Sequence, residues 1–376
     1  DLLSIYGEMR SNWYESGAVN DAFFNRVGTN VLLSGDAGTN WSSIYTTINS
    51  ANLILKHTPE ISFTNEATRN EVMANAYFLR AYCYFTLVRV FGDCPLLTSG
   101  FESEKQEDMY PSRTAASEVY AQVETDIEEA LRLVPASSKL LHKASPAAIN
   151  MLRTEYYLWK AKRLGGGNAA LSTAQSSVDA VLKAGYALLP TFADIFNLNN
   201  EANSELIWTL PYIVNENVTP GTSPNFFAYY LAPNGDRTRL REAGYTEDEV
   251  PAGSHAQYVV PTQAYCDFLA EDARDTRTDV SVRVFEDKFL TEEVQIKRMV
   301  VKFKGSFAND TRSFDSDVPV YRLAEAYLLK AEVENALGNT DAALQNLNVV
   351  AKRAYWVDTY YTARTQDAID NAIISE

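Results

Sequence analysis

The sequence has few of the side chains that carry most enzymatic and metal chemistry. Its 376 residues include 3 His and 3 Cys, and no two cysteines have the C-x-x-C spacing of zinc knuckles or thioredoxin-type redox sites. The G-x-S-x-G and H-E-x-x-H motifs are also absent. His57 and His142 are isolated and expected at the surface or at helix ends, whereas His255 lies in an aromatic loop and is open to a ligand contact. We therefore expect a protein that is not an enzyme.

Positive charge is scarce as well. There are 33 Lys and Arg against 49 Asp and Glu, so the formal net charge is −16. Nucleic-acid binding and polybasic attachment to membranes both draw on clustered Lys and Arg. The charge balance excludes both classes.

Long apolar runs are missing too. The nearest candidate, residues 72–91, is interrupted by Asn75, Arg80 and Arg89 and is typical of a buried helix rather than a membrane span. The first residue is Asp1, without a leader sequence, and Thr365–Glu376 reads as a helix without a stop signal. We expect both termini to be incomplete.

Helix start and stop signals, in contrast, are frequent. Ser145-Pro146 combines an N-cap hydroxyl with proline at the first helical position, and Gly165–Gly167 marks a turn. Apolar residues recur with helical spacing between such signals. The predicted helices are 71–91, 117–134, 146–164, 168–185, 319–337 and 341–354.

Two of the predicted helical hairpins resemble each other. Residues 157–161 (YLWKA) echo residues 327–331 (YLLKA), and an Ala-Ala-Leu follows each turn, at 169–171 and at 342–344. Such diverged helix pairs are typical of tetratricopeptide-like hairpins, which usually form a scaffold for a partner. Between them, residues 196–261 lack a helical period, apart from a short predicted strand at 205–211. Loop-rich segments of this size are more often functional than idle.

The aromatic content is high, with 22 Tyr, 17 Phe and 5 Trp. Trp41, Trp159 and Trp208 are expected to pack in the interior, as is Cys83, because large aromatic residues and free Cys favour burial. A disulfide between Cys94 and Cys266 stays open. Residues 272–279 alternate Asp with Arg and are expected to form a self-paired ionic loop at the surface.

Several stretches resemble the SusD/RagB family of surface lipoproteins from Bacteroidetes. Residues 75–97 are similar to the signature helix of that family, and Trp41 to Asn52 is similar to its W-x-x-x-Y-x-x-I-x-x-A-N stretch. The segments 113–135, 184–188, 196–207 and 319–332 also match in the expected order. The likeness covers nearly the whole chain.

The resemblance implies one SusD-like domain over 1–376, mostly α-helical. Tetratricopeptide-like hairpins, at about 45–92, 113–164, 168–185 and 319–355, would pack against an irregular, loop-rich ligand-binding half formed by about 1–42 and 196–315. The N-terminal cysteine that carries the lipid in this family is absent from the sequence, and the final segment of the family stops at Ile373–Glu376.

The resemblance also implies a function in nutrient capture. Such a protein would be lipid-anchored at the outer membrane and cell surface, where it binds oligo- or polysaccharide for import by a TonB-dependent, SusC-like transporter. Two alternatives stay open, a peptide-binding receptor of the RagB type and a tetratricopeptide adaptor with only protein ligands. No cofactor is expected, although a structural Ca²⁺ stays open.

Sugar capture suggests where the ligand would bind. Pyranose rings stack on flat aromatic side chains, while Asn, Asp and Arg make hydrogen bonds to the hydroxyls. Two clusters combine these residue types, one near the N-terminus and one in the loop-rich segment. The candidate ligand-binding residues are Arg10, Asn12, Trp13, Tyr14, Asn40, Trp41, Phe226, Tyr229, Tyr230 and Tyr258.

Overall fold

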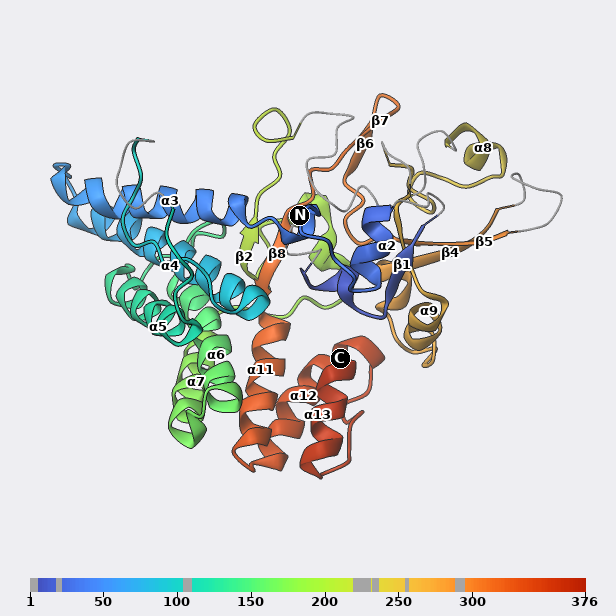
Figure 1. The fold of residues 1–376 in the computed structure, drawn as a ribbon. Helices are drawn as coiled ribbons and strands as arrows, with labels where there is room; N and C mark the ends of the chain where they lie inside the picture. The colour runs from blue at the N-terminus through green and yellow to red at the C-terminus, as the bar shows by residue number, and fades with distance from the viewer. Residues whose placement is uncertain are drawn as a thin grey trace.

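The structure, a computed structural model, describes residues 6–17, 22–103, 110–218, 231, 237–253, 257–287 and 295–376. Long helices make up one half of the molecule and confirm the predicted mostly α fold (Figure 1). They are α3 (Ser42–His57), α4 (Glu66–Phe91), α5 (Ala116–Leu133), α6 (Pro146–Arg163), α7 (Gly167–Leu182), α11 (Leu323–Ala336), α12 (Thr340–Tyr355) and α13 (Gln366–Ser375).

The long helices pack mainly on their neighbours. Helix α4 packs against both α3 and α5, α6 pairs with α7, and α11 pairs with α12 while also contacting α7. The sequence analysis predicted that the helices within 113–164 form one hairpin. In the structure, α5 makes more extensive contact with α4 than with α6. The reason is that α5 buries its apolar face, including Val123 and Ile127, in the core around α4.

The prediction of one helix over 319–337 is wrong at its beginning. Residues Val318–Arg322 form strand β8, which pairs antiparallel with β2 (Leu206–Leu210), and α11 begins only at Leu323. A partner strand that lies more than 100 residues away decides this conformation, so helical periodicity alone missed it. The strand expected at 205–211 is confirmed by β2.

Trp208 of β2 lies at the centre of the main core. Its exposed fraction is 3%, and its ring centroid is 4.8 Å from that of Phe78 and 5.1 Å from that of Tyr82, both on α4. Tyr321 of β8 completes the contact at 5.8 Å. The β2–β8 pair is thus packed onto the helical half, as expected for Trp208.

Capping fixes where several helices begin. The Ser145 hydroxyl accepts a hydrogen bond from the Ala148 amide at 3.1 Å, as the Ser145-Pro146 signal predicts. The Asn65 side chain accepts from the Ala67 amide at 2.9 Å and starts α4, five residues before the predicted beginning at Glu71. All three cysteines are free, so the disulfide left open by the sequence is not formed.

We expect Asn65→Ala to lower the free energy of unfolding by about 1 kcal/mol, because it leaves an amide at the first turn of α4 without its acceptor. Chemical denaturation would measure the change. Asn65→Asp is the control, because it keeps an acceptor at the cap and a negative charge near the helix N-terminus. A loss as large in the Asp variant would contradict this role.

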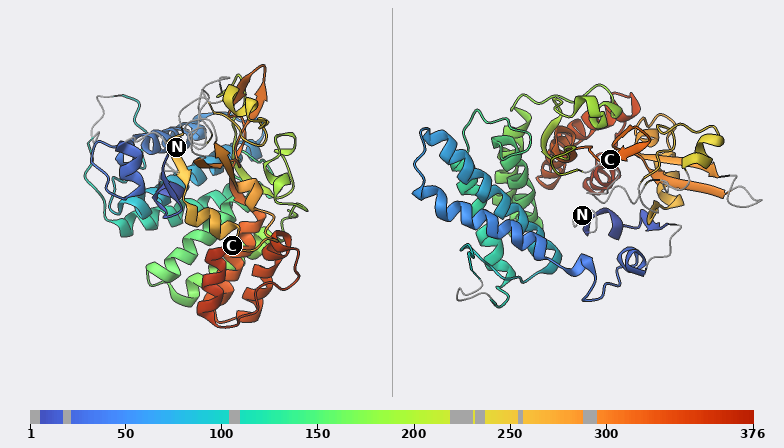
Figure 2. Two further views of the ribbon diagram at one scale, coloured as in Figure 1. Left: turned by 90° about the vertical axis from the view of Figure 1, so that its right-hand side faces the viewer. Right: turned by 90° about the horizontal axis from the view of Figure 1, so that it is seen from above.

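The other half of the molecule consists of short helices and two-stranded sheets, which lie to the right in Figure 1 and in the view from above in Figure 2. Antiparallel pairing joins β1 with β3, β4 with β5, and β6 with β7. The elements are α2 (Ala22–Gly28), α8 (Arg237–Glu242), α9 (Gln263–Leu269), α10 (Thr278–Ser281), β1 (Tyr14–Ser16), β3 (Val259–Pro261), β4 (Val282–Asp287), β5 (Gln295–Val300), β6 (Ser306–Ala308) and β7 (Thr311–Ser313).

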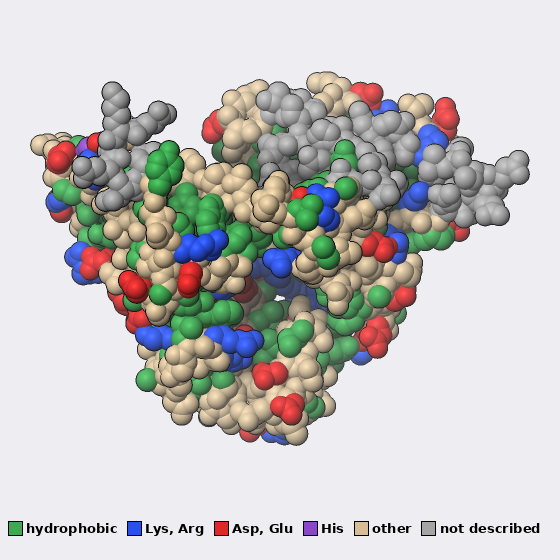
Figure 3. Space-filling view, in the orientation of Figure 1, with side chains coloured by type: hydrophobic (Ala, Val, Ile, Leu, Met, Phe, Trp, Pro, Cys, Tyr) green, Lys and Arg blue, Asp and Glu red, His purple; other side chains and the backbone are tan. Residues whose placement is uncertain are grey.

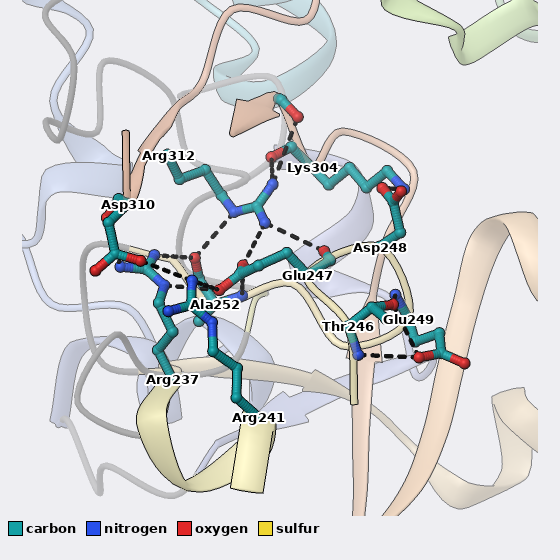
Figure 4. Close-up of polar contacts among 11 residues, drawn as sticks. Arg237, Arg241, Thr246, Glu247, Asp248, Glu249, Ala252, Lys304, Asp310 and Arg312 are labelled. Carbon is teal, nitrogen blue, oxygen red and sulfur yellow. Dashed lines mark hydrogen bonds and ion pairs between the residues drawn. The ribbon is translucent and has the colours of Figure 1, made fainter. Parts of the chain in front are cut away.

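A buried arginine organises the β6–β7 end of this half (Figure 4). Arg312 has an exposed fraction of 2%. Its guanidinium donates to the carbonyl oxygens of Ala252 and Lys304, both at 2.9 Å, and to the Glu247 carboxylate at 2.7 Å. Arg237 of α8 donates to the same carboxylate at 2.8 Å. Because the sheets here are small, this polar cluster supplies cohesion that a large apolar core supplies elsewhere.

Candidate functional site

Three aromatic side chains lie together at the mouth of a cavity. The ring centroid of Trp13 is 5.3 Å from that of Phe268, at an interplanar angle of 28°, and 5.1 Å from that of Tyr265. Trp13 is 39% exposed and Phe268 36%. Flat aromatic rings that solvent reaches can stack on the apolar face of a sugar ring. We call Trp13, Tyr265 and Phe268 the aromatic shelf.

Backbone pairing between distant segments builds this shelf. Strand β1 pairs with β3, with Tyr14 opposite Pro261, and the Thr262 amide donates to the Trp13 carbonyl at 2.8 Å. The Thr262 hydroxyl then caps α9 by accepting from the Tyr265 amide at 3.2 Å. Because Thr262 is hydrogen-bonded both to Trp13 and to the Tyr265 amide, Trp13 is held against the first turns of α9.

The cavity behind the shelf has a volume of about 330 Å³. On the face drawn in Figure 3 the molecule is hollowed near its middle, and Lys and Arg side chains show in the depth of the hollow. None of the residues described at the cavity is a His or Cys, which suits binding better than nucleophilic catalysis. Its lining is Trp13, Phe192, Tyr265, Phe268, Leu269, Arg277, Ser281, Lys302, Arg322, Leu328, Val350, Arg353, Ala354, Ile374, Ser375 and Glu376.

A buried carboxylate holds two of the cationic side chains of the cavity. Glu205, just before β2, has no exposed surface. One of its oxygens lies 3.2 Å from a nitrogen of Arg322, and the other accepts from Arg353 and from the Leu189 amide, the latter at 2.9 Å. Burial lowers the pKa of Arg353, and the nearby charges of Arg322 and Arg277 act in the same direction against the attraction of Glu205.

Arg277, by contrast, is hydrogen-bonded to three side chains of the protein. It donates to both oxygens of Asp275 at 2.9 and 2.8 Å, to the Tyr355 hydroxyl at 2.7 Å and to the Glu376 carboxylate at 2.7 Å. Burial acts to lower the pKa of Arg277, but the bonds to Asp275 and the charge of Glu376 outweigh it and raise that pKa. The prediction that Asp275 and Arg277 pair with each other is confirmed. Their expected place at the surface is wrong, because these two side chains are 5% and 12% exposed.

Of the predicted N-terminal cluster, Trp13 alone lines the cavity. Tyr14 lies beside the shelf, with its ring 5.7 Å from that of Tyr265. The Arg10 side chain instead donates to the Asn30 side-chain oxygen at 2.7 Å, and Asn12 is exposed. These residues remain ligand-binding predictions with different positions relative to the cavity.

The other two N-terminal candidates have packing or turn contacts. The Asn40 side-chain oxygen accepts from the Ser42 amide at 2.9 Å, at the beginning of α3. Trp41 packs against Phe91 at 5.1 Å between ring centroids, and the guanidinium of Arg113 lies 4.7 Å from its ring. These contacts match the packing interpretation of Trp41 given by the sequence.

The second predicted cluster is described only in part. Phe226, Tyr229 and Tyr230 lie outside the described residues, as does His255. Tyr258 is half-buried, and its ring lies 5.0 Å from that of Phe24 in a small apolar cluster. Because β1 pairs with β3, Tyr258 lies one residue before the strand that borders the N-terminal cluster.

The sequence reasoning missed Tyr265 and Phe268 and the cationic residues of the cavity. The aromatic pair had a local signal, since it occurs at i and i+3 after the cap Thr262 and before a stretch rich in Asp. Lys302 lies between β5 and β6, Arg322 is in β8 and Arg353 is in α12, and these three cations had no such signal. In the described ranges, no group of three or more His, Cys, Asp and Glu residues is arranged to hold a metal ion. No helix there is long and apolar enough to cross a membrane.

Comparisons with known proteins agree with this architecture. A family model described as "Starch-binding associating with outer membrane" (SusD-like) matches residues 6–157, and a model of the SusD family matches residues 285–376. SusD-like protein P25 of Formosa agariphila is 26% identical over 87% of this chain, and the chain spans 64% of the length of that relative. The two family models together cover more than half of the chain.

Solved structures show the same fold over 99% of the chain. The structure of B. fragilis NanU superposes with a TM-score of 0.83 and 25% identity, covering 99% of this chain and 80% of NanU. A SusD superfamily protein from Bacteroides vulgatus gives a TM-score of 0.83 with 26% identity and covers 99% and 83% of the two chains. The helical pairs, the packed β2–β8 strands and these matches lead to one assignment. The chain belongs to the SusD family.

Proposed function

We propose that this protein binds oligo- or polysaccharide at the outer face of the cell and delivers it to a SusC-like, TonB-dependent transporter, without chemical conversion of the glycan. The observation that carries the proposal is the aromatic shelf, formed by Trp13, Tyr265 and Phe268 at the mouth of a cavity with polar walls. Membership of the SusD family supports it, since one matching family model is described as starch-binding and associated with the outer membrane. A lipid anchor would hold the protein there.

Binding is expected to be modest for a short glycan. A neutral hydrogen bond contributes only about 1 kcal/mol net of its competition with water, so stacking on the shelf would provide much of the affinity. A polymer that engages several copies of the protein at one surface would bind more tightly through multivalency.

Trp13→Ala should weaken binding of a glycan at least tenfold, which corresponds to about 1.4 kcal/mol. Affinity electrophoresis against a polysaccharide panel, followed by isothermal titration of the best ligand, would measure it. Trp356→Ala is the matched control, because Trp356 is 66% exposed and does not line the cavity.

Two outcomes would redirect the proposal. If peptides bind and no glycan does, the peptide-receptor alternative replaces it. If Trp13→Ala and Trp356→Ala bind the glycan as tightly as the unmodified protein, the shelf is not the binding platform.

A further inference from the structure

The cavity behind the aromatic shelf has a charge opposite to that of the protein as a whole. Its walls carry four cationic side chains, Arg277, Lys302, Arg322 and Arg353, and one carboxylate, Glu376. The chain as a whole has a formal net charge of −16. Such a concentration of positive charge in an acidic protein attracts anions to one place.

Two of these guanidinium groups, those of Arg322 and Arg353, share a single carboxylate. Asp275 and Glu376 together balance Arg277. In the part of the chain that the structure describes, Glu205 is the one carboxylate within ion-pair distance of Arg322 or Arg353. One buried carboxylate therefore serves two guanidinium groups, and the lowered pKa of Arg353 reflects burial together with its cationic neighbours.

The cations converge on one side of the cavity, around the ring of Phe192. The Lys302 ammonium lies 5.4 Å from the centroid of this ring, and the guanidinium carbons of Arg322 and Arg353 lie at 5.7 and 5.9 Å. Phe192 is 4% exposed, so these three cations surround a buried aromatic ring. The Arg322 side chain is 28% exposed and remains accessible to a ligand.

We infer that the site takes a glycan with anionic sugar units, which carry a carboxylate or a sulfate ester. One sugar ring stacks on Trp13 and Phe268, and its anionic group points into the cavity toward Arg322 and Lys302. Hydrogen bonds between ionised partners are roughly twice as strong as neutral ones. The inference rests on the proposed function, because it names the class of glycan that the shelf binds.

The experiment compares three oligosaccharide probes of equal length by isothermal titration at two salt concentrations. They are a neutral galactan, an oligogalacturonate that carries carboxylates, and a carrageenan oligomer that carries sulfates. At least one anionic probe should bind ten times more tightly than the neutral galactan and should lose affinity in high salt. The two anionic probes distinguish carboxylate from sulfate recognition.

Arg322→Gln should remove this preference, so that the anionic probes bind no more tightly than the neutral galactan. Lys302→Gln provides a second test that leaves the Arg322–Glu205 contact in place. Lys56→Gln is the matched control, since Lys56 pairs with Glu102 on the surface, does not line the cavity, and gives the same change in net charge.

Equal or tighter binding of the neutral galactan would overturn the inference and leave glycan capture itself intact. So would an equal loss for charged and neutral probes in both cavity variants. If no probe and no polysaccharide of the wider panel binds, the proposed function fails and the inference fails with it.

Discussion

Arg80→Met should lower the free energy of unfolding by about 3–5 kcal/mol, because it leaves a buried carboxylate without its counter-ion. Arg80 on α4 donates to both oxygens of Asp126 on α5, at 2.7 and 2.6 Å. Asp126 has no exposed surface, so water cannot replace the lost partner. Urea denaturation followed by circular dichroism would measure the loss.

The same arginine also joins a third helix. It donates to the side-chain oxygen of Asn52 on α3 at 2.7 Å, and Asn52 donates in turn to the Leu97 carbonyl at 2.9 Å. The substitution therefore disturbs the packing of α3, α4 and α5 together. We expect a single cooperative transition at lower denaturant concentration rather than local loosening.

The loss should depend on pH. Burial raises the pKa of Asp126 even with Arg80 beside it. A carboxyl whose folded pKa lies above its unfolded value adds stability at low pH that disappears as the pH rises through the folded pKa. Without Arg80 that pKa rises further, so the difference between variant and unmodified protein should be smaller at about pH 4 than near neutrality.

Two comparisons make the prediction specific. Arg132→Met removes an ion pair with Glu129 whose side chains are 63% and 37% exposed, and it should leave the free energy of unfolding almost unchanged, because solvent screens exposed ion pairs. The double variant Arg80→Met, Asp126→Leu should recover much of the loss, because an apolar pair can replace a buried ion pair. A double variant as unstable as Arg80→Met would show that the charge of Asp126 is not the cause.

The sequence predicted the helical half well because its signals are local. Ser145-Pro146 and Gly165–Gly167 act within a few residues of the helix ends that they define. The prediction for residues 318–322 was wrong because the signal there is not local. Their strand conformation depends on pairing with β2, and no pattern within the segment itself records a partner so distant.

The candidate site likewise contains residues with a local signal in the sequence and residues without one. Trp13 could be predicted because it lies in a short segment that combines aromatic rings with Arg and Asn side chains, the residue types that sugar binding uses. In the sequence, Arg322 and Arg353 are ordinary residues of two predicted helices, and only the fold brings both to Glu205. A charge cluster assembled from three distant segments has no signature in one sequence, whereas the geometry shows it directly.

Arg312→Met should release the β6–β7 end of the molecule at a local cost on the order of 3–5 kcal/mol. Besides Ala252 and Lys304, the Arg312 guanidinium donates to the Glu247 carbonyl at 3.2 Å and to its carboxylate at 2.7 Å. Burial lowers the pKa of Arg312, with Glu247 acting against this, and these four hydrogen bonds to oxygen compensate for the cost of placing the charge inside. Methionine has similar length but leaves several buried carbonyl groups without a donor.

Hydrogen exchange distinguishes this local effect from a global one. Amides of residues 246–252 and 305–313 should exchange faster in Arg312→Met, while those of α4 keep their protection, because the Arg312 side chain bonds to its own half of the molecule and not to the main core. Arg312→Lys should lose nearly as much protection of these amides, since an ammonium keeps the charge but cannot direct donors to Ala252, Lys304 and Glu247 at once. Full protection with lysine would mean that charge alone holds this end of the molecule together. Equal loss of protection in α4 would mean that the two halves unfold as one unit.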